Sequence, residues 1–280
     1  MSKILAIVNQ KGGVGKTTTS INLSTAFAAV GKNTLLVDLD PQGNASTGLG
    51  ISYKSREEKN IYKILLSSRN RPIESAIFNI KEIPNLSLIS SVVDLSAAEI
   101  ELSQLKHGKF VLKEALEKIR GNYEYIIIDC PPSLGLLTIN ALTAADSIIV
   151  PLQCEFFALE GLSHLVKTVE LIKKSNLNPS LKIEGIVLTM YDRRNKLSEQ
   201  IKNDICQYLN DKVYKTIIPL YETIIPRNVR LSEAPSHGKP AIVYDFKCPG
   251  AQAYINLAKE ILRKHTSICK EKKLVNEGVA

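Results

Sequence analysis

A glycine-rich segment near the start of the chain constrains its fold more than any other feature. Residues 4–8 read Ile-Leu-Ala-Ile-Val, and residues 10–18 read Gln-Lys-Gly-Gly-Val-Gly-Lys-Thr-Thr. This order is explained by an apolar strand, a turn whose glycines let backbone N–H groups approach an anion, and a helix that begins at the Lys-Thr pair. An ordinary glycine-rich turn is the alternative, but the strand context, the spacing and the Lys-Thr pair favour a phosphate-binding loop.

The loop departs from the general phosphate-loop pattern G-x-x-x-x-G-K-[ST] at its first position. Gln10 stands where the pattern has glycine, and Lys11 precedes the glycine pair, so the loop contains two lysines. We expect Lys16 to reach the terminal phosphates of a nucleotide and the Thr17 hydroxyl to bind Mg²⁺. The nucleotide-binding residues predicted from the motif are Lys11, Gly12, Gly13, Val14, Gly15, Lys16, Thr17 and Thr18.

Two aspartates follow the next strand-like run. Residues 33–37 are predicted to form a strand, with Asp38 at its end and Asp40 two residues later. Ligands of open α/β sheets bind at the carboxyl ends of the strands, which is where both carboxylates would lie. Solvated turn residues are the alternative, but the phosphate-binding loop upstream favours a functional site.

A third aspartate ends another apolar run. Residues 125–128 read Tyr-Ile-Ile-Ile and are followed by Asp129. In nucleotide hydrolases a carboxylate at this place meets Mg²⁺. A helix cap is the alternative, but Pro131 and Pro132 disfavour an immediate helix start. The predicted metal-binding residues are Thr17, Asp40 and Asp129.

Strand-like runs alternate with helical stretches along the chain, which predicts an α/β fold with a single doubly wound, mostly parallel sheet flanked by helices. The 280 residues are 44% hydrophobic, which is enough for one substantial core. We find no linker rich in Pro, Gly or Ser and no low-complexity tract. The expected organisation is one nucleotide-binding domain over residues 1–266 and a basic, flexible tail over residues 267–280.

The amino-terminal sequence and the cysteines indicate a cytoplasmic protein. Lys3 leads directly into the apolar run and the glycine-rich loop, so no signal peptide is expected. The five cysteines are scattered and form no C-x-x-C pair, which argues against a disulfide scaffold, a zinc site or an iron–sulfur cluster. They are Cys130, Cys154, Cys206, Cys248 and Cys269.

Basic residues are concentrated in the second part of the chain. Residues 1–159 contain 16 Lys and Arg against 15 Asp and Glu, whereas residues 160–280 contain 20 against 13. Nearly all of the formal net charge of +8 therefore lies after residue 159. Such a surface favours a polyanion partner such as nucleic acid, because neutralised phosphates release counterions; a solvated basic surface is the alternative.

These segments resemble the ParA/Soj family of partition ATPases, in the wider group with a deviant phosphate loop that includes MinD. The likeness extends from about residue 3 to about residue 264 and is carried by residues 11–18, 38–44, 125–142, 151–161 and 227–240. The last two segments favour the Soj-like chromosomal branch. The resemblance implies a P-loop NTPase fold with a deviant Walker A motif and a Mg²⁺-dependent ATPase that acts in chromosome segregation and converts ATP to ADP and phosphate.

The resemblance also implies a mechanism. Lys16 and the loop amides hold the β- and γ-phosphates, Asp40 positions the attacking water, and Lys11 crosses to the ATP of a second subunit. The expected catalytic residues are therefore Asp40, Lys16 and Lys11. ATP would join two subunits face to face as a homodimer, and hydrolysis would release them. Asp38 either supports Mg²⁺ or shapes the loop.

In Soj-like proteins, arginines near the dimer edge bind double-stranded DNA without sequence preference. The matching residues here are Arg194 and Arg230, and the additional candidates beside them are Arg193, Lys196 and Arg227. The family partner is ParB, a centromere-binding protein, which would stimulate hydrolysis and release the ATPase from DNA. The resemblance thus implies a cytoplasmic, nucleoid-associated protein with ATP and Mg²⁺ as cofactors.

Two other functions use the same loop. A MinD-like membrane-associated positioning ATPase would need an amphipathic helix at the carboxyl terminus. Residues 253–264 have helical periodicity, but we expect their apolar stripe to pack on the sheet, so no membrane partner is expected. A metal-cluster carrier would need cysteines that bridge a dimer, whereas Cys130 and Cys154 are expected to be small core residues.

A short tandem repeat departs from the family pattern. Residues 216–219 read Thr-Ile-Ile-Pro, and the same four residues recur at 223–226. Family members generally have one copy, so we expect a small insertion in a surface loop. Because this region borders the adenine pocket in relatives, Pro226 and Asn228 are the expected base-contacting residues.

Overall fold

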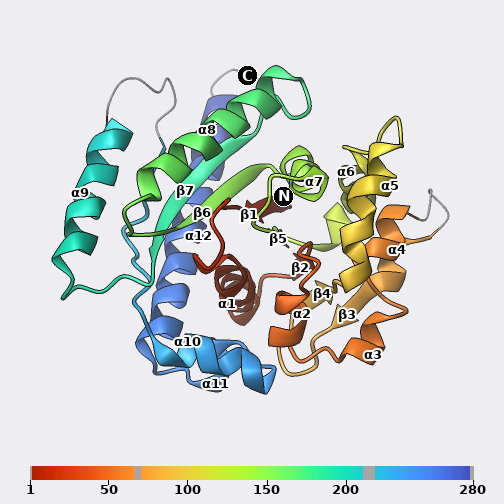
Figure 1. Cartoon of the computed structure of the whole chain (residues 1–280), viewed down its shortest axis with the longest axis horizontal. Coiled ribbons are helices and arrows are strands. Elements are labelled where there is room, and N and C mark those ends of the chain that lie inside the picture. The colour runs from red at the N-terminus through yellow and green to blue at the C-terminus, as the bar shows by residue number, and fades with distance from the viewer. Residues whose placement is uncertain (1, 67–70, 211–217, 278–280) are drawn as a thin grey trace.

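A seven-stranded sheet runs through the centre of the protein (Figure 1) in the computed structural model, which describes residues 2–66, 71–210 and 218–277. The strands follow the order β3-β4-β2-β5-β1-β6-β7 across the sheet. Neighbouring strands are parallel except for β3 and β4, which are antiparallel. The strands are β1 (Lys3–Ile7), β2 (Thr34–Asp38), β3 (Ile77–Asn79), β4 (Leu86–Ile89), β5 (Tyr125–Asp129), β6 (Ser147–Gln153) and β7 (Lys182–Thr189).

Helices connect the strands and cover both faces of the sheet, so the doubly wound α/β fold is confirmed. The α-helices are α1 (Lys16–Ala29), α2 (Asn44–Gly48), α3 (Tyr53–Arg56), α4 (Ile61–Leu66), α5 (Ala98–Ser103), α6 (Val111–Glu117), α7 (Leu136–Ala144), α8 (Ala158–Lys174), α9 (Lys196–Asn210), α10 (Val229–Glu233), α11 (Ala241–Tyr244) and α12 (Pro249–Glu277). Short 3₁₀ turns cover Ile73–Ala76, Val93–Ala97, Arg120–Asn122 and Ala234–His237.

The core has two layers, one on each face of the sheet. Successive side chains of a strand point to opposite faces, so Ile4 and Ala6 of β1 pack on one side and Leu5 and Ile7 on the other. The first layer is completed by apolar residues of α4 to α9, and the second by α1, α11 and α12. In Figure 1, α7 and α8 lie above the strands, and α1, α10 and α11 lie below them.

The strand register brings the predicted site residues to one edge. Asp129 at the end of β5 is in register with Ile7 at the end of β1 and with Asp38 at the end of β2. The loop after β1 therefore meets the carboxylates at the ends of β2 and β5, at the carboxyl edge of the sheet. This is the point where the strand order reverses, with β5 and β2 on one side of β1 and β6 on the other.

The tandem repeat is more than a surface loop, which corrects the sequence-based expectation. Thr216 and Ile217 lie outside the described residues, but the rest of the segment follows β7: Ile186 N donates to Pro219 O, Tyr221 N to Ile186 O, and Ile225 N to Leu188 O, all within 2.9 Å. Tyr221 is only 2% exposed and packs against Gly185 of β7. Part of the repeat segment is thus hydrogen-bonded to β7 and buried, instead of projecting into solvent.

The last helix is longer than the periodicity of residues 253–264 predicts. α12 begins at Pro249 and reaches Glu277, so its backbone includes most of the segment that the sequence assigns to a tail. The division of the chain at residue 266 stays a prediction. No helix of the described residues combines the length and the apolar composition needed to cross a bilayer.

Candidate nucleotide-binding site

The glycine-rich loop joins β1 to α1 and is fixed at both sides. Gly13 and Gly15 have φ of +76° and +88°, a conformation that glycine adopts without steric cost. The Asn9 side chain donates to Pro151 O at 2.7 Å and accepts from Lys11 N at 2.9 Å. On the other side, the Thr189 hydroxyl donates to Val14 O at 2.8 Å. The loop is therefore preorganised at the amino terminus of α1, where the helix dipole favours an anion.

The two lysines of the loop lie in different environments. Lys16 is only 7% exposed, and its Nζ donates to Lys11 O at 3.0 Å, so the amine is folded inside the loop. Burial lowers the pKa of Lys16, while Asp129, Cys130 and Asp40 oppose this shift. Lys11 is instead partly exposed and forms an ion pair with Glu155 of the same chain, just after β6.

Asp129 is fully buried below the loop. The Ser20 hydroxyl donates to Asp129 Oδ1 at 2.8 Å, whereas Oδ2 has no hydrogen-bond partner among the described residues. Burial raises the pKa of Asp129 to about 8, the Asp38 carboxylate adds to the rise, and the hydroxyls of Ser20 and Thr17 oppose it. A buried oxygen without a partner beside the Thr17 hydroxyl is suited to a hard cation.

These residues fit a bound Mg²⁺ that is shared with a nucleotide. No group of three or more His, Cys, Asp or Glu side chains in the described parts of the chain could hold a metal ion by itself. That agrees with Mg²⁺, which is usually bound by one or two protein groups together with substrate phosphates. Thr17 and Asp129 are the residues that would hold it here, as the sequence predicts.

Asp38 has a structural role in the loop that follows β2. Its Oδ2 accepts from Ser46 N at 2.8 Å and from Ser46 Oγ at 2.6 Å, and its Oδ1 accepts from Asp40 N at 3.4 Å. Burial raises the pKa of Asp38 to about 6 against these hydrogen bonds. Because both carboxylate oxygens already have donors, the contacts favour loop shaping over metal binding.

Asp40 opens a tight turn close to the phosphate loop. Gly43 N donates to Asp40 O at 2.9 Å, with Pro41 at the second position, and Gln42 N donates to Asp40 Oδ1 at 2.9 Å. The side chain of Asp40 is 8% exposed. One carboxylate oxygen is thus held by the turn.

Both predicted adenine contacts and three of the five predicted DNA contacts line one cavity of about 820 Å³. It is lined by Pro226, Asn228, Arg193, Arg194 and Arg227, among others. Asn228 Oδ1 also accepts from Arg230 N at 3.1 Å and so caps α10. The cavity lies between the loop after β7 and the segment before α10. These two segments are held together by a hydrogen bond from Arg227 N to Tyr191 O at 3.2 Å.

The predicted DNA-binding residues differ in their exposure and in their acidic partners. The Arg194 side chain is 94% exposed and lies 3.5 Å from Asp192. Arg230 is paired with Glu233 at 2.8 Å and with Asp245 at 3.4 Å. Lys196 is the first residue of α9, beside the same loop. The structure therefore places Arg193, Arg194 and Arg227 around one opening and gives Arg230 acidic partners that a polyanion would have to displace.

Sequence reasoning missed the residues that support the site from a distance. Ser20 contacts Asp129, Ser46 contacts Asp38, and Thr189 holds the loop. Only Ser20 had a local signal, because it lies one helical turn after Lys16 on the same face of α1. Cys130, Cys154, Cys206 and Cys248 are free thiols, and all but Cys206 are buried.

Comparisons with known proteins agree with this geometry. A family model described as an AAA domain matches residues 2–183. The chromosome partitioning protein ParA of Caulobacter vibrioides is 54% identical over 264 residues, which cover 94% of each chain. The sporulation initiation inhibitor protein Soj of Bacillus subtilis is 54% identical over 261 residues, 93% of this chain and 98% of that one. A solved structure of cobyrinic acid a,c-diamide synthase from Mycobacterium smegmatis, with bound ADP and magnesium, is 35% identical with a TM-score of 0.80 and covers 95% of this chain and 96% of its own.

Proposed function

The chain belongs to the ParA/Soj family of chromosome-partitioning ATPases, and we propose that ATP joins two copies of it into a sandwich dimer that binds DNA without sequence preference. Hydrolysis, stimulated by a ParB-like partner, then releases it. The observation that carries the proposal is the contrast between the two lysines. Lys16 is buried inside its own loop, whereas Lys11 is partly exposed and reaches outward to Glu155.

The chemistry asks mainly for positioning and charge neutralisation. The loop amides and Lys16 would surround the β- and γ-phosphates, and Thr17 and Asp129 would hold Mg²⁺, which neutralises phosphate charge when bound. Asp40, fixed by its turn, aligns the attacking water. We keep Asp40 as a further candidate for contact with the metal, through water.

Lys11 completes the site in trans. In the single chain it pairs with Glu155, and both side chains are more than 40% exposed. Such a surface ion pair stabilises by at most about 1 kcal/mol, so a phosphate of a second copy can readily compete for Lys11. Two copies face to face would then each supply a lysine to the other's ATP.

DNA binding follows from pairing two basic surfaces. Each copy presents Arg193, Arg194 and Arg227 around one cavity, with Lys196 and Arg230 nearby. Each phosphate contact multiplies the affinity for DNA by a factor. Doubling the number of contacts therefore raises the affinity by orders of magnitude. A ParB-like protein that accelerates hydrolysis would end this state and give the protein a changing position on the nucleoid.

A MinD-like membrane role is the alternative, and the packing of α12 speaks against it. Leu257, Ala258 and Ile261 are at most 2% exposed and belong to the core layer against the sheet. The apolar stripe of residues 253–264 is therefore occupied by the protein's own sheet and is not available to a lipid surface.

The dimer is tested by light scattering after size-exclusion chromatography, with Mg-ATP and with Mg-ADP. We expect the unmodified chain and Asp40→Ala to double in mass with ATP only, and Lys11→Ala and Lys16→Ala to stay single. Lys32→Ala is the matched control, because Lys32 also forms a surface ion pair, with Glu124, but lies away from the loop. A Lys11→Ala variant that dimerises like the unmodified chain would contradict the crossing lysine.

A further inference from the structure

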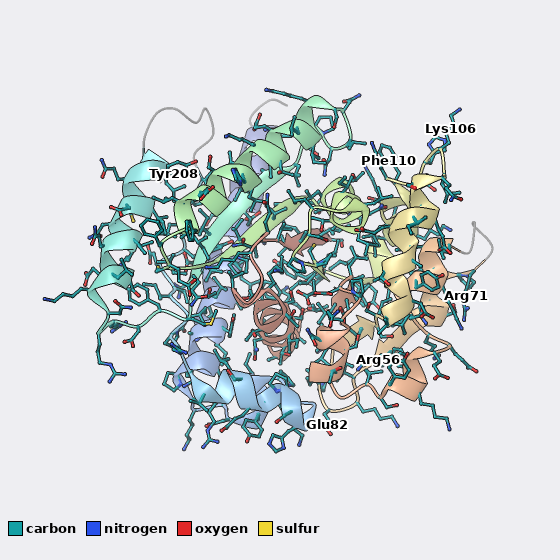
Figure 2. The ribbon with its side chains drawn as sticks, in the orientation of Figure 1. Arg56, Arg71, Glu82, Lys106, Phe110 and Tyr208 are labelled. Carbon is teal, nitrogen blue, oxygen red and sulfur yellow. The ribbon has the colours of Figure 1, made fainter. Side chains whose placement is uncertain are left out.

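A buried arginine lies behind the turn that carries Asp40. Arg56 is the last residue of α3 and is only 6% exposed, although its side chain is charged (Figure 2 shows it beside α2 and α3). No carboxylate lies within ion-pair distance of it in the described part of the chain. A charge in this position is costly unless its N–H groups are satisfied by other acceptors.

The acceptors of Arg56 all belong to the segment that follows Asp40. Nη1 donates to Gly43 O at 3.2 Å, and Nη2 donates to the Thr47 hydroxyl at 2.9 Å. Nε donates to Ile51 O at 3.0 Å, and Nη2 shares this carbonyl. One planar group therefore ties together the start, the middle and the exit of the α2 region.

The Gly43 carbonyl is the direct link to Asp40. Gly43 closes the Asp40 turn through its N–H, and its own carbonyl accepts from Arg56 Nη1 as well as from the N and Oγ1 of Thr47. The packing is tight here: a Cβ at Gly43 would lie 2.9 Å from Arg56 Nη1 and 3.3 Å from Ser91 O, and Gly43 has φ of +63°. On the other side, Ser46 Oγ donates to Asp38 and accepts from Ser91 N at 3.0 Å.

We propose that Arg56 is a positioning residue for ATP hydrolysis, which keeps the Asp40 carboxylate in place by holding the carbonyl of Gly43. The hydrogen bonds of Arg56 go to the segment after Asp40 and not to the phosphate loop, so we expect it to act on turnover and not on ATP binding. Displacement of a catalytic group by about 1 Å can reduce a rate about 100-fold. Lysine cannot replace Arg56, because a single ammonium cannot direct donors to three separate acceptors in one plane.

This inference rests on the role proposed for Asp40, so the test includes Asp40→Ala beside Arg56→Lys and Arg56→Ala. The measured quantities are kcat for ATP, the affinity for a fluorescent ATP analogue, and the melting temperature, all on the full chain. Arg120→Ala is the matched control, since Arg120 pairs with Asp146 at 2.7 Å and contacts Ser2 O, at the opposite edge of the sheet. Thr47→Val is a second probe, which leaves the arginine in place but removes one acceptor of Arg56 and the hydroxyl's own hydrogen bond to Gly43 O.

We expect both Arg56 variants to lose at least about tenfold in kcat, with the affinity for the ATP analogue changed less than about threefold. Thr47→Val should lose a smaller factor in kcat with the same unchanged affinity. Arg120→Ala should lower the melting temperature and leave kcat unchanged. A cavity of about 330 Å³ is lined by Arg56, Gly43 and Thr47, so millimolar guanidinium should enter it and restore part of kcat in Arg56→Ala.

Asp40→Ala should be inactive and should not respond to guanidinium. The inference is overturned if Arg56→Ala folds and keeps full kcat while Asp40→Ala is inactive, or if kcat and ATP affinity fall together. If Arg56→Ala does not fold, unchanged kcat in Thr47→Val overturns it. Full turnover in Asp40→Ala would instead contradict the proposed role of Asp40, and the inference would fall with it.

Discussion

Asp38 and Asp129 lie directly opposite each other at the carboxyl ends of β2 and β5, and both carboxyl groups are fully buried. Their hydrogen bonds differ. Both oxygens of Asp38 accept from the loop that follows it, whereas Asp129 keeps one oxygen without a partner in the described residues. Two carboxylates at one edge therefore have separate tasks: Asp38 shapes the loop that presents Asp40, and Asp129 faces the phosphate loop.

Removal of the Ser20 hydroxyl should weaken Mg²⁺ binding. This hydroxyl donates to Asp129 Oδ1 at 2.8 Å and favours the ionised carboxylate. Groups that support a metal-binding residue typically contribute about 10-fold or more to metal affinity, so Ser20→Ala should raise the Mg²⁺ concentration for half-maximal ATP turnover by about that factor. Ser24→Ala is the control, because in the described residues the Ser24 hydroxyl bonds within α1, to Ser20 O. Equal Mg²⁺ dependence in the two variants would argue against this role.

Loss of the Glu184 charge should destabilise the opposite edge of the sheet. Burial alone would raise the pKa of Glu184, but hydrogen bonds with His265 and Ser147 and the charge of Lys3 bring that pKa well below its usual range. A carboxyl group of this kind stabilises the fold above its unfolded pKa of about 4.3, and the stabilisation is lost as the pH falls below that value. Glu184→Gln should therefore lower the free energy of unfolding by about 3 kcal/mol at neutral pH. The stability of this variant should also depend less on pH in the acid range.

Denaturant unfolding at a series of pH values measures this effect. Glu170→Gln serves as the control, because Glu170 forms a partly exposed pair with Lys173 and its loss should change stability by less than about 0.5 kcal/mol. If Glu184→Gln keeps the acid sensitivity of the unmodified chain, the Glu184 cluster is not its source.

The Tyr221 hydroxyl should be dispensable for folding. Tyr221 is 2% exposed, and its hydroxyl has no hydrogen-bond partner in the described part of the protein. A buried polar group without a partner costs about 1–3 kcal/mol, so Tyr221→Phe should be neutral or stabilising. Tyr221→Ala, which also removes the ring that packs on Gly185, should cost about 3–5 kcal/mol. A melting temperature that drops equally in both variants would contradict the burial of the inserted segment.

Weakening the Lys11–Glu155 ion pair should favour the dimer. Glu155→Gln leaves Lys11 without its partner in the same chain. Because exposed pairs contribute at most about 1 kcal/mol, the ATP concentration for half-maximal dimerisation should fall by no more than about fivefold. Glu124→Gln, which breaks the surface pair with Lys32, should leave it unchanged. A higher ATP requirement in Glu155→Gln would mean that Glu155 itself supports the dimer.

The sequence predicted the parts of the site that are local motifs. The phosphate loop follows β1, Asp40 lies two residues after the end of β2, and Asp129 ends β5, so the parallel sheet brings them together without further information. The supporting contacts could not be predicted in this way. Thr189 meets Val14 across 175 residues, and Ser20 meets Asp129 across 109, so only the folded chain shows these pairs.

The tandem repeat shows why the prediction of a surface-loop insertion was wrong. Repetition of Thr-Ile-Ile-Pro indicates an insertion, and insertions are usually accommodated at the surface. Here Gly185 leaves room on β7 for the Tyr221 ring. The Lys264 Nζ lies over this ring, 4.4 Å from its centre. A glycine in the middle of a strand was the signal for this close approach.

The most direct test of the account is binding of the full chain to a random-sequence duplex across a salt series, with ATP, with ADP, and with Lys11→Ala in ATP. We expect tight binding only for the unmodified chain with ATP, with affinity that falls steeply as salt rises, because the contacts are to phosphates. Arg194→Ala should reduce both the affinity and the salt slope. Equal binding in all nucleotide states, or unimpaired binding by Lys11→Ala, would contradict a DNA-binding state made by ATP-dependent pairing of two copies.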